Sequence, residues 1–205
     1  MHWKNTIRFW FLLLIIPLVF PETGLASTIR YKEQFWRMYH QQLYMYPLDI
    51  AENIHWLETA LRMDFANPLW AIARIENERE WEKYRNLFLS HISVKLVELY
   101  LQWGNEHYKH RAYFYNAPWK QENLESLSKA ESLFEFALVY WEDAKEYAEA
   151  AQQFSWINLE EIQNWEDEAY RIQTGQLDYE AIINRHLTRL NETRRTFEEM
   201  DSSTY

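Results

Sequence analysis

The stretch Lys129–Tyr140, K-A-E-S-L-F-E-F-A-L-V-Y, decides how this chain folds. Within it, Ala130, Phe134 and Ala137 recur at the spacing of one face of a helix. Small residues let a neighbouring helix approach closely, and the Phe134 ring fills the space between the two helices. The stretch therefore predicts a helix that packs against other helices.

The composition of the 205-residue chain extends this prediction to the whole molecule. Aromatic residues make up 18% of the chain, whereas only three glycines and five prolines are present. So few glycines leave little material for hairpins and ligand-cradling loops, and helices with bulky aromatic faces fit better. We predict an all-α fold.

Residues 1–26 have the pattern of a secretory signal peptide. Lys4 and Arg8 form a positive region, an apolar run extends from Phe9 to Phe20, and small residues precede a cleavage point after Ala26. An uncleaved anchor is the alternative, although the apolar run is shorter than the roughly 20 residues of a membrane span. We expect a periplasmic or secreted protein with one domain at 27–205, and membrane contact only through residues 1–26 if they are retained.

Cysteine content and charge exclude several classes of function. The absence of cysteine removes disulfides, thiol catalysis and cysteine-based zinc sites. A formal net charge of −10 argues against nucleic acid and against an anionic membrane surface as the partner. The sequence also lacks glycine-rich phosphate loops and G-x-S-x-G motifs, so we expect no cofactor.

Prolines and capping residues divide the mature chain into about seven to eight helices. A first helix ends near Met45, and a second follows Pro47 and stops before Pro68. From Pro68 to about Tyr113 we expect two long helices with a bend near Ser90–Ser93. Four more helices are expected. The first spans 122–141, and the second spans 144–154 with Asp143 as its cap. The third begins at an Asn158–Glu161 capping box and ends at Gly175, and the fourth spans 179–200 with Asp178 as its cap.

Two segments of the chain match each other without a gap. Ala60–Ala73 and Ala137–Ala150 both begin with Ala-Leu, and Trp70 in the first corresponds to Tyr147 in the second. Each segment resembles the junction between two tetratricopeptide repeats, where one repeat ends at Ala-Leu and the next begins after a short polar turn. The stretch Tyr100-x-x-Trp-Gly-Asn-x-x-Tyr108 resembles the first-helix signature of the same family.

This resemblance implies antiparallel helix hairpins stacked as a solenoid, with a groove that takes peptides or partner helices. The segment 109–125 does not fit a standard repeat, and its aromatic residues would cover the groove or anchor a partner. The competing interpretations are an unrelated helical bundle, and a core position between repeats for Trp70 and Tyr147. The candidate partner-binding residues are Trp70, Tyr100, Asn105, Tyr113, Tyr115, Trp119 and Tyr147.

Two groups of residues could suggest chemistry. Glu106, His107 and His110 lie at helical spacing, but a zinc site needs three or four ligands and no H-E-x-x-H motif is present, so we expect a solvated polar face. Glu131-Ser132 resembles the catalytic pair of exported lytic transglycosylases, whose acid needs a raised pKa. The glycine-rich segment of those enzymes is missing, and we expect Glu131 on the exposed side of its helix.

We therefore expect an exported, non-enzymatic helical scaffold that binds another protein within a cell-envelope assembly. In general build it is similar to the small tetratricopeptide-like proteins of the spirochaete periplasmic flagellar-motor collar. One alternative is a periplasmic protein that binds a lipid or another small apolar molecule. The other alternative is a cell-wall lytic enzyme that uses Glu131.

Overall fold

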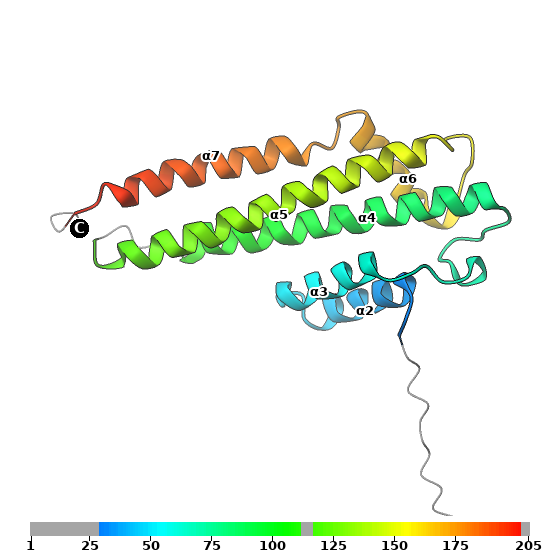
Figure 1. Cartoon of the computed structure of the whole chain (residues 1–205), viewed down its shortest axis with the longest axis horizontal. Coiled ribbons are helices and arrows are strands. Elements are labelled where there is room, and N and C mark those ends of the chain that lie inside the picture. The colour runs from blue at the N-terminus through cyan, green and yellow to red at the C-terminus, as the bar shows by residue number, and fades with distance from the viewer. Residues whose placement is uncertain (1–28, 112–116, 202–205) are drawn as a thin grey trace, which may run out of the picture.

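The computed structural model describes residues 29–111 and 117–201, and these residues form six α-helices and no β-strand (Figure 1). The all-α prediction is confirmed. The predicted signal peptide lies outside the described residues. The α-helices are α2 (Lys32–Met45), α3 (Ile50–Arg62), α4 (Glu78–Asn105), α5 (Lys120–Gln152), α6 (Gln163–Gln173) and α7 (Tyr179–Glu198), with short helical turns η2 (Pro68–Trp70), η3 (Glu106–Arg111), η4 (Ala117–Trp119) and η5 (Glu160–Ile162).

Two seams of buried residues explain why α5 is one helix of 33 residues. Each seam repeats every seven residues, and together they alternate steps of three and four, which keeps them on one face as in a coiled coil. No proline or glycine interrupts this face. The seams are Leu127, Phe134, Trp141 and Ala148, and Ala130, Ala137, Ala144 and Ala151, all at most 2% exposed.

The long helix α4 runs antiparallel to α5 and forms the spine of the molecule with it (Figure 1). Gly104 near the end of α4 faces Phe134, whereas the Ser90 hydroxyl donates to the carbonyl oxygen of Ala144 at 3.0 Å. The alanine seam lets the two backbones approach closely along this whole length. The prediction that small residues at 130 and 137 serve helix packing is confirmed.

The other helices cover this spine from different sides. Helix α7 runs antiparallel along α5 and buries Ile183, Leu190 and Phe197, again seven residues apart. The α2–α3 hairpin lies on the opposite side of the spine from α7 (Figure 1), and Trp36 of α2 contacts the ring of Phe88 of α4. Helix α6 packs between α4 and the C-terminal end of α5. None of the helices in the described ranges is both long and apolar enough to cross a membrane.

Several predicted boundaries are confirmed. Helix α2 ends at Met45, as expected. Asp178 caps α7, because its Oδ1 accepts from the backbone N–H of Ala181 at 3.0 Å. Gly175 follows α6 with a φ of 69°, a left-handed conformation that favours glycine.

The predicted start at Pro68 is wrong. Pro68 begins only the short turn η2, and α4 starts ten residues later, where the Asn77 side chain accepts from the N–H groups of Arg79 and Glu80 at 3.1 Å. The expected Asn158–Glu161 capping box does not form either. Instead the N–H of Leu159 donates to the Glu166 carboxylate at 3.0 Å.

The expected interruptions at Ser90–Ser93 and at Asp143 are also wrong, since α4 and α5 run through both positions. The two matched segments therefore differ in structure. Ala60–Ala73 spans the end of α3 and the loop after it, whereas Ala137–Ala150 lies wholly inside α5. Their shared alanine spacing reflects close packing in both places, not a shared helix–turn–helix junction.

Candidate functional site

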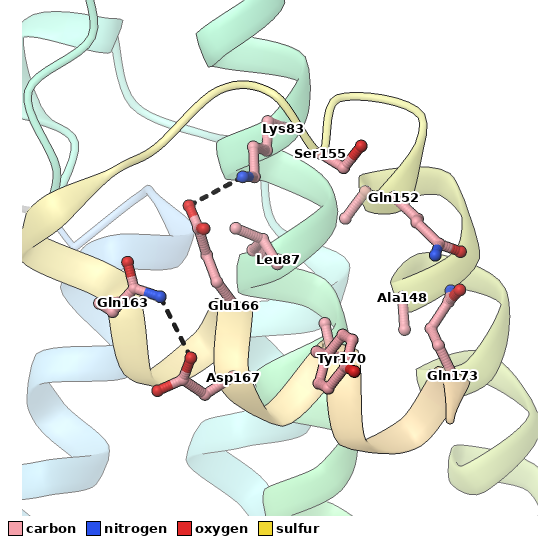
Figure 2. A pocket seen from close by; sticks show the side chains of 12 residues that line it. Lys83, Leu87, Ala148, Gln152, Ser155, Gln163, Glu166, Asp167, Tyr170 and Gln173 are labelled. Carbon is pink, nitrogen blue, oxygen red and sulfur yellow. Dashed lines mark hydrogen bonds and ion pairs between the residues drawn. The ribbon is translucent and has the colours of Figure 1, made fainter. Parts of the chain in front are cut away.

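A pocket of about 360 Å³ opens between α4, the C-terminal end of α5 and α6 (Figure 2). This volume lies near the lower end of the range for small-molecule sites. Ala148 explains the position of the pocket, because earlier members of its seam on α5 are Leu, Phe and Trp. The inner wall is formed by the buried side chains of Leu87, Ala148, Ala151 and Ala169.

An ion pair supplies the polar part of the pocket interior (Figure 2). The Lys83 ammonium lies 2.9 Å from Glu166 Oε1, and the two side chains are 4% and 16% exposed. Lys83 also donates to the carbonyl oxygen of Ile157, while Glu166 accepts from the N–H of Leu159. A buried ammonium is tolerated when such partners replace water. The pair therefore joins α4 and α6 to the loop that connects α5 with α6.

Hydrogen-bonding groups, all neutral except Asp167, surround the mouth of the pocket. Helix α6 places Gln163, Asp167 and Tyr170 on one face, because they are four and three residues apart. The Gln163 amide donates to Asp167 Oδ1 at 3.1 Å, and the Tyr170 side chain is 62% exposed (Figure 2). The remaining polar lining comes from Gln152, Ser155 and Gln173.

A second candidate site is the turn between α2 and α3. Four large apolar side chains are exposed at the last two residues of α2 and on the turn itself, which together we call the α2–α3 turn: Tyr44 is 89%, Met45 53%, Tyr46 55% and Leu48 80% exposed. Turns normally carry polar residues, and a cluster of exposed apolar side chains often marks an interaction site. None of the predicted binding residues lies in this site, although the run Y-M-Y-P-L at a predicted turn indicates it in the sequence.

The structure places Tyr100, one of the predicted partner-binding residues, in the protein interior. The hydroxyls of Tyr100 and Tyr140 both donate to Glu58 Oε1, at 2.7 and 2.9 Å, and their rings stack with centroids 5.5 Å apart. Burial, with the hydrogen bonds to Glu58, raises the pKa of both phenols well above the ordinary value. Tyr100 is 7% exposed and joins α3 to the spine, so its role as a surface contact is not supported.

The other predicted site residues that the structure describes are not brought together. Trp70 in η2 is 71% exposed, and Trp119 in η4 is 47% exposed. Trp70 precedes α4 and Trp119 precedes α5. Because α4 and α5 are antiparallel, the two tryptophans lie toward opposite ends of the spine. Tyr147 is half-buried within α5 and not at a helix start, which corrects its predicted position. The Asn105 amide oxygen is buried, without a hydrogen-bond partner among the described residues. Tyr113 and Tyr115 lie outside the described residues.

Glu131 lies in an ion pair on the surface between α5 and α7. The two terminal guanidinium nitrogens of Arg194, Nη1 and Nη2, donate hydrogen bonds to its carboxylate at 3.1 and 2.6 Å. These hydrogen bonds hold the pKa of Glu131 below its ordinary value, the opposite of what a general acid needs. His107 is buried, which corrects the solvated position expected for it, and the side chain of His110 lies outside those that the structure describes. The described side chains contain no group of three or more that could hold a metal ion.

A family model described as Domain of unknown function (DUF8513) matches residues 79–200, more than half of the chain. The chain therefore belongs to this family. The matched region runs from the first turn of α4 to the end of α7 and includes the pocket, whereas the α2–α3 turn precedes it. No curated protein and no solved structure matches the chain.

Proposed function

We propose that this protein is a non-enzymatic helical scaffold that binds another protein through the turn between α2 and α3. The observation that carries the proposal is the exposure of Tyr44, Met45, Tyr46 and Leu48 on one short turn. Tyrosine is among the residues that dominate protein–protein binding energy. A turn that projects apolar side chains would insert into an apolar cleft of the partner.

Hydrogen bonds hold this turn in one conformation. The N–H of Tyr46 donates to the carbonyl oxygen of Gln42 at 2.7 Å. The N–H of Asp49 donates to the carbonyl oxygen of Tyr46 at 3.1 Å. Asp49 then caps α3 by accepting from the N–H of Glu52. Because the turn is already ordered, binding would cost little conformational entropy.

Charge next to the turn favours a particular kind of partner. Asp49 and Glu52 follow the apolar residues, and no lysine or arginine lies between Arg37 and Arg62. An apolar cleft rimmed by basic side chains would complement this surface. The same charges disfavour an anionic membrane, because membrane-surface binding depends on lysine and arginine.

The sequence supports the wider setting of the proposal. The pattern of residues 1–26 favours export, and the tetratricopeptide resemblance implies the same class of function, protein binding within a cell-envelope assembly. The stacking of helix hairpins as a solenoid remains part of this proposal. The α2–α3 hairpin supports this arrangement, and the continuity of α5 through the second matched segment argues against it.

The test compares the wild type with Tyr44→Ser/Leu48→Ser and with Trp156→Ser, which changes another exposed aromatic residue away from the turn. Proteins captured from the native cell envelope by the wild type are identified, purified and titrated against all three proteins. We expect the turn variant to weaken binding at least about tenfold, since hot-spot side chains each contribute 2 kcal/mol or more. We expect Trp156→Ser to bind like the wild type.

Two results would contradict the proposal. The first is a partner that binds the turn variant as tightly as the wild type, because binding would then use another surface. The second is flotation of the wild type, but not of the turn variant, with vesicles of neutral and anionic phospholipid. That result would assign the turn to a membrane surface instead of a protein.

A further inference from the structure

We propose that the pocket between α4, α5 and α6 binds a neutral saccharide unit. This pocket and the α2–α3 turn share no residue, so the inference goes beyond the proposed protein-binding function. Its position follows from Ala148 and Ala151, whose small side chains leave space near the end of α5. About 360 Å³ is room for a small ligand and not for a folded peptide segment.

The polar lining fits a ligand with hydroxyl groups. Gln152 comes from α5 and Gln163 and Gln173 from α6, and each amide offers both a donor and an acceptor (Figure 2). A hydroxyl group likewise donates and accepts at once. Such groups can therefore pair with several ligand hydroxyls without leaving a buried polar atom unsatisfied.

Charge inside the pocket favours a neutral ligand. Lys83 and Glu166 compensate one another at 2.9 Å, so neither offers a free charge to an ionic ligand. Asp167 adds one negative charge at the mouth, and the partner shown for it is the neutral amide of Gln163. An anionic ligand would meet this carboxylate and Glu166 without gaining an uncompensated cation.

The apolar surfaces fit the C–H face of a sugar ring. Leu87 and the two alanines of α5 form the buried wall, and the Tyr170 ring lies at the mouth (Figure 2). An aromatic ring has an apolar face that can pack against C–H groups while its hydroxyl stays hydrated. Tyr170 is 62% exposed without a ligand, and a stacked sugar would cover it.

The inference is tested by ligand-observed saturation-transfer NMR with D-glucose, N-acetyl-D-glucosamine and D-glucuronate at millimolar concentrations. We expect the wild-type protein to bind at least one of the two neutral sugars, and to bind glucuronate more weakly than that neutral sugar. Tyr170→Leu should weaken binding by about three- to tenfold through the lost ring face. Gln152→Leu should weaken it by about two- to tenfold through the lost hydrogen bonds.

Tyr44→Leu is the matched control, since Tyr44 is an exposed tyrosine outside the pocket; its sugar binding should equal that of the wild type. Ala148→Leu fills the pocket, and it should abolish binding while circular dichroism shows an intact helical fold. The inference is overturned if neither neutral sugar binds, if glucuronate binds as tightly as the neutral sugar that binds best, or if Tyr170→Leu binds like the wild type. A failure here leaves the α2–α3 turn proposal standing, because that test uses other residues and another ligand.

Discussion

Gly104 of α4 lies so close to the ring of Phe134 of α5 that no side chain fits between them: a Cβ at Gly104 would lie 2.8 Å from Cδ1 of Phe134. Phe134 is fully buried and its ring also stacks on His186, so it cannot move aside easily. Overpacking costs about 1–3 kcal/mol, against about 1 kcal/mol that alanine gains in a helix. The difference between these two terms predicts that Gly104→Ala lowers the free energy of unfolding by up to about 2 kcal/mol in urea denaturation.

The control for this variant is Gln102→Ala, at an exposed position on the same turn of α4, which should change stability by less than about 0.5 kcal/mol. Combining Gly104→Ala with Phe134→Leu should cost less than the sum of the two single changes, because the smaller side chain makes room. Strict additivity would show that the two residues do not share this contact.

The Lys83–Glu166 pair predicts how firmly α6 is held on the spine. Lys83→Met removes the ammonium and leaves the mostly buried Glu166 carboxylate with only the Leu159 N–H as its described donor. Losing one member of a buried pair costs about 3–5 kcal/mol. We expect the lower half of this range, since Glu166 remains 16% exposed, and expect faster amide hydrogen exchange throughout α6.

The double variant Lys83→Met/Glu166→Leu separates the pair from the packing around it. Replacing both charges by apolar side chains is often neutral or stabilising. We therefore expect the double variant to recover at least half of the stability that Lys83→Met loses. If it is less stable than the single variant, the ion pair is not the reason why Lys83→Met destabilises the protein.

The heptad pattern of α5 shows what the sequence could reveal about the fold. Positions 127–151 alternate buried residues in steps of three and four without a break, which predicts one long helix. The predicted helix start after Asp143 rests on a residue that can cap a helix but is equally compatible with a half-buried position inside one. Periodicity over 25 residues is the stronger signal, because the whole buried face depends on it.

The candidate sites differ in how far the sequence could predict them. The α2–α3 turn could be found from the four large apolar residues that flank Pro47. The pocket could not, because Leu87, Ala148 and Tyr170 come from three helices whose register is set by packing. Tyr100 was misassigned for a related reason: only the structure brings Glu58 of α3 within hydrogen-bond distance of its hydroxyl.

Stability at alkaline pH should depend on Tyr39, which is 4% exposed on α2. Burial, together with the nearby Glu98 carboxylate, raises the pKa of Tyr39 to about 12 from the ordinary 10. Between these values the unfolded chain loses the proton first, so the stabilisation that Tyr39 provides below pH 10 is lost as the pH rises toward 12. We expect the free energy of unfolding to fall in this window.

Tyr39→Phe tests this dependence by comparison of denaturation curves from pH 9 to 12. The free energy of unfolding should fall less steeply with pH in the variant than in the wild type. The difference in slope should be at most that of one titrating group. Burial lowers the pKa of Lys32 to about 8, an effect of opposite sign that is shared by both proteins and cancels in the comparison. Identical slopes for the two proteins would contradict the assignment to Tyr39.

The Glu131–Arg194 ion pair predicts a small loss of stability in acid and no role in catalysis. The hydrogen bonds from Arg194 lower the pKa of Glu131, so its contribution is present above the ordinary pKa of about 4.5 and is lost as the pH falls below it. The side chains are 32% and 21% exposed, so Glu131→Gln should cost about 0.5–1 kcal/mol at pH 7 and less at pH 3. Glu135→Gln, which changes an exposed carboxylate one turn further along α5, should change stability by less than about 0.3 kcal/mol at either pH.

Peptidoglycan cleavage by the wild type that disappears in Glu131→Gln would refute the non-enzymatic assignment, whereas a loss of stability alone agrees with it.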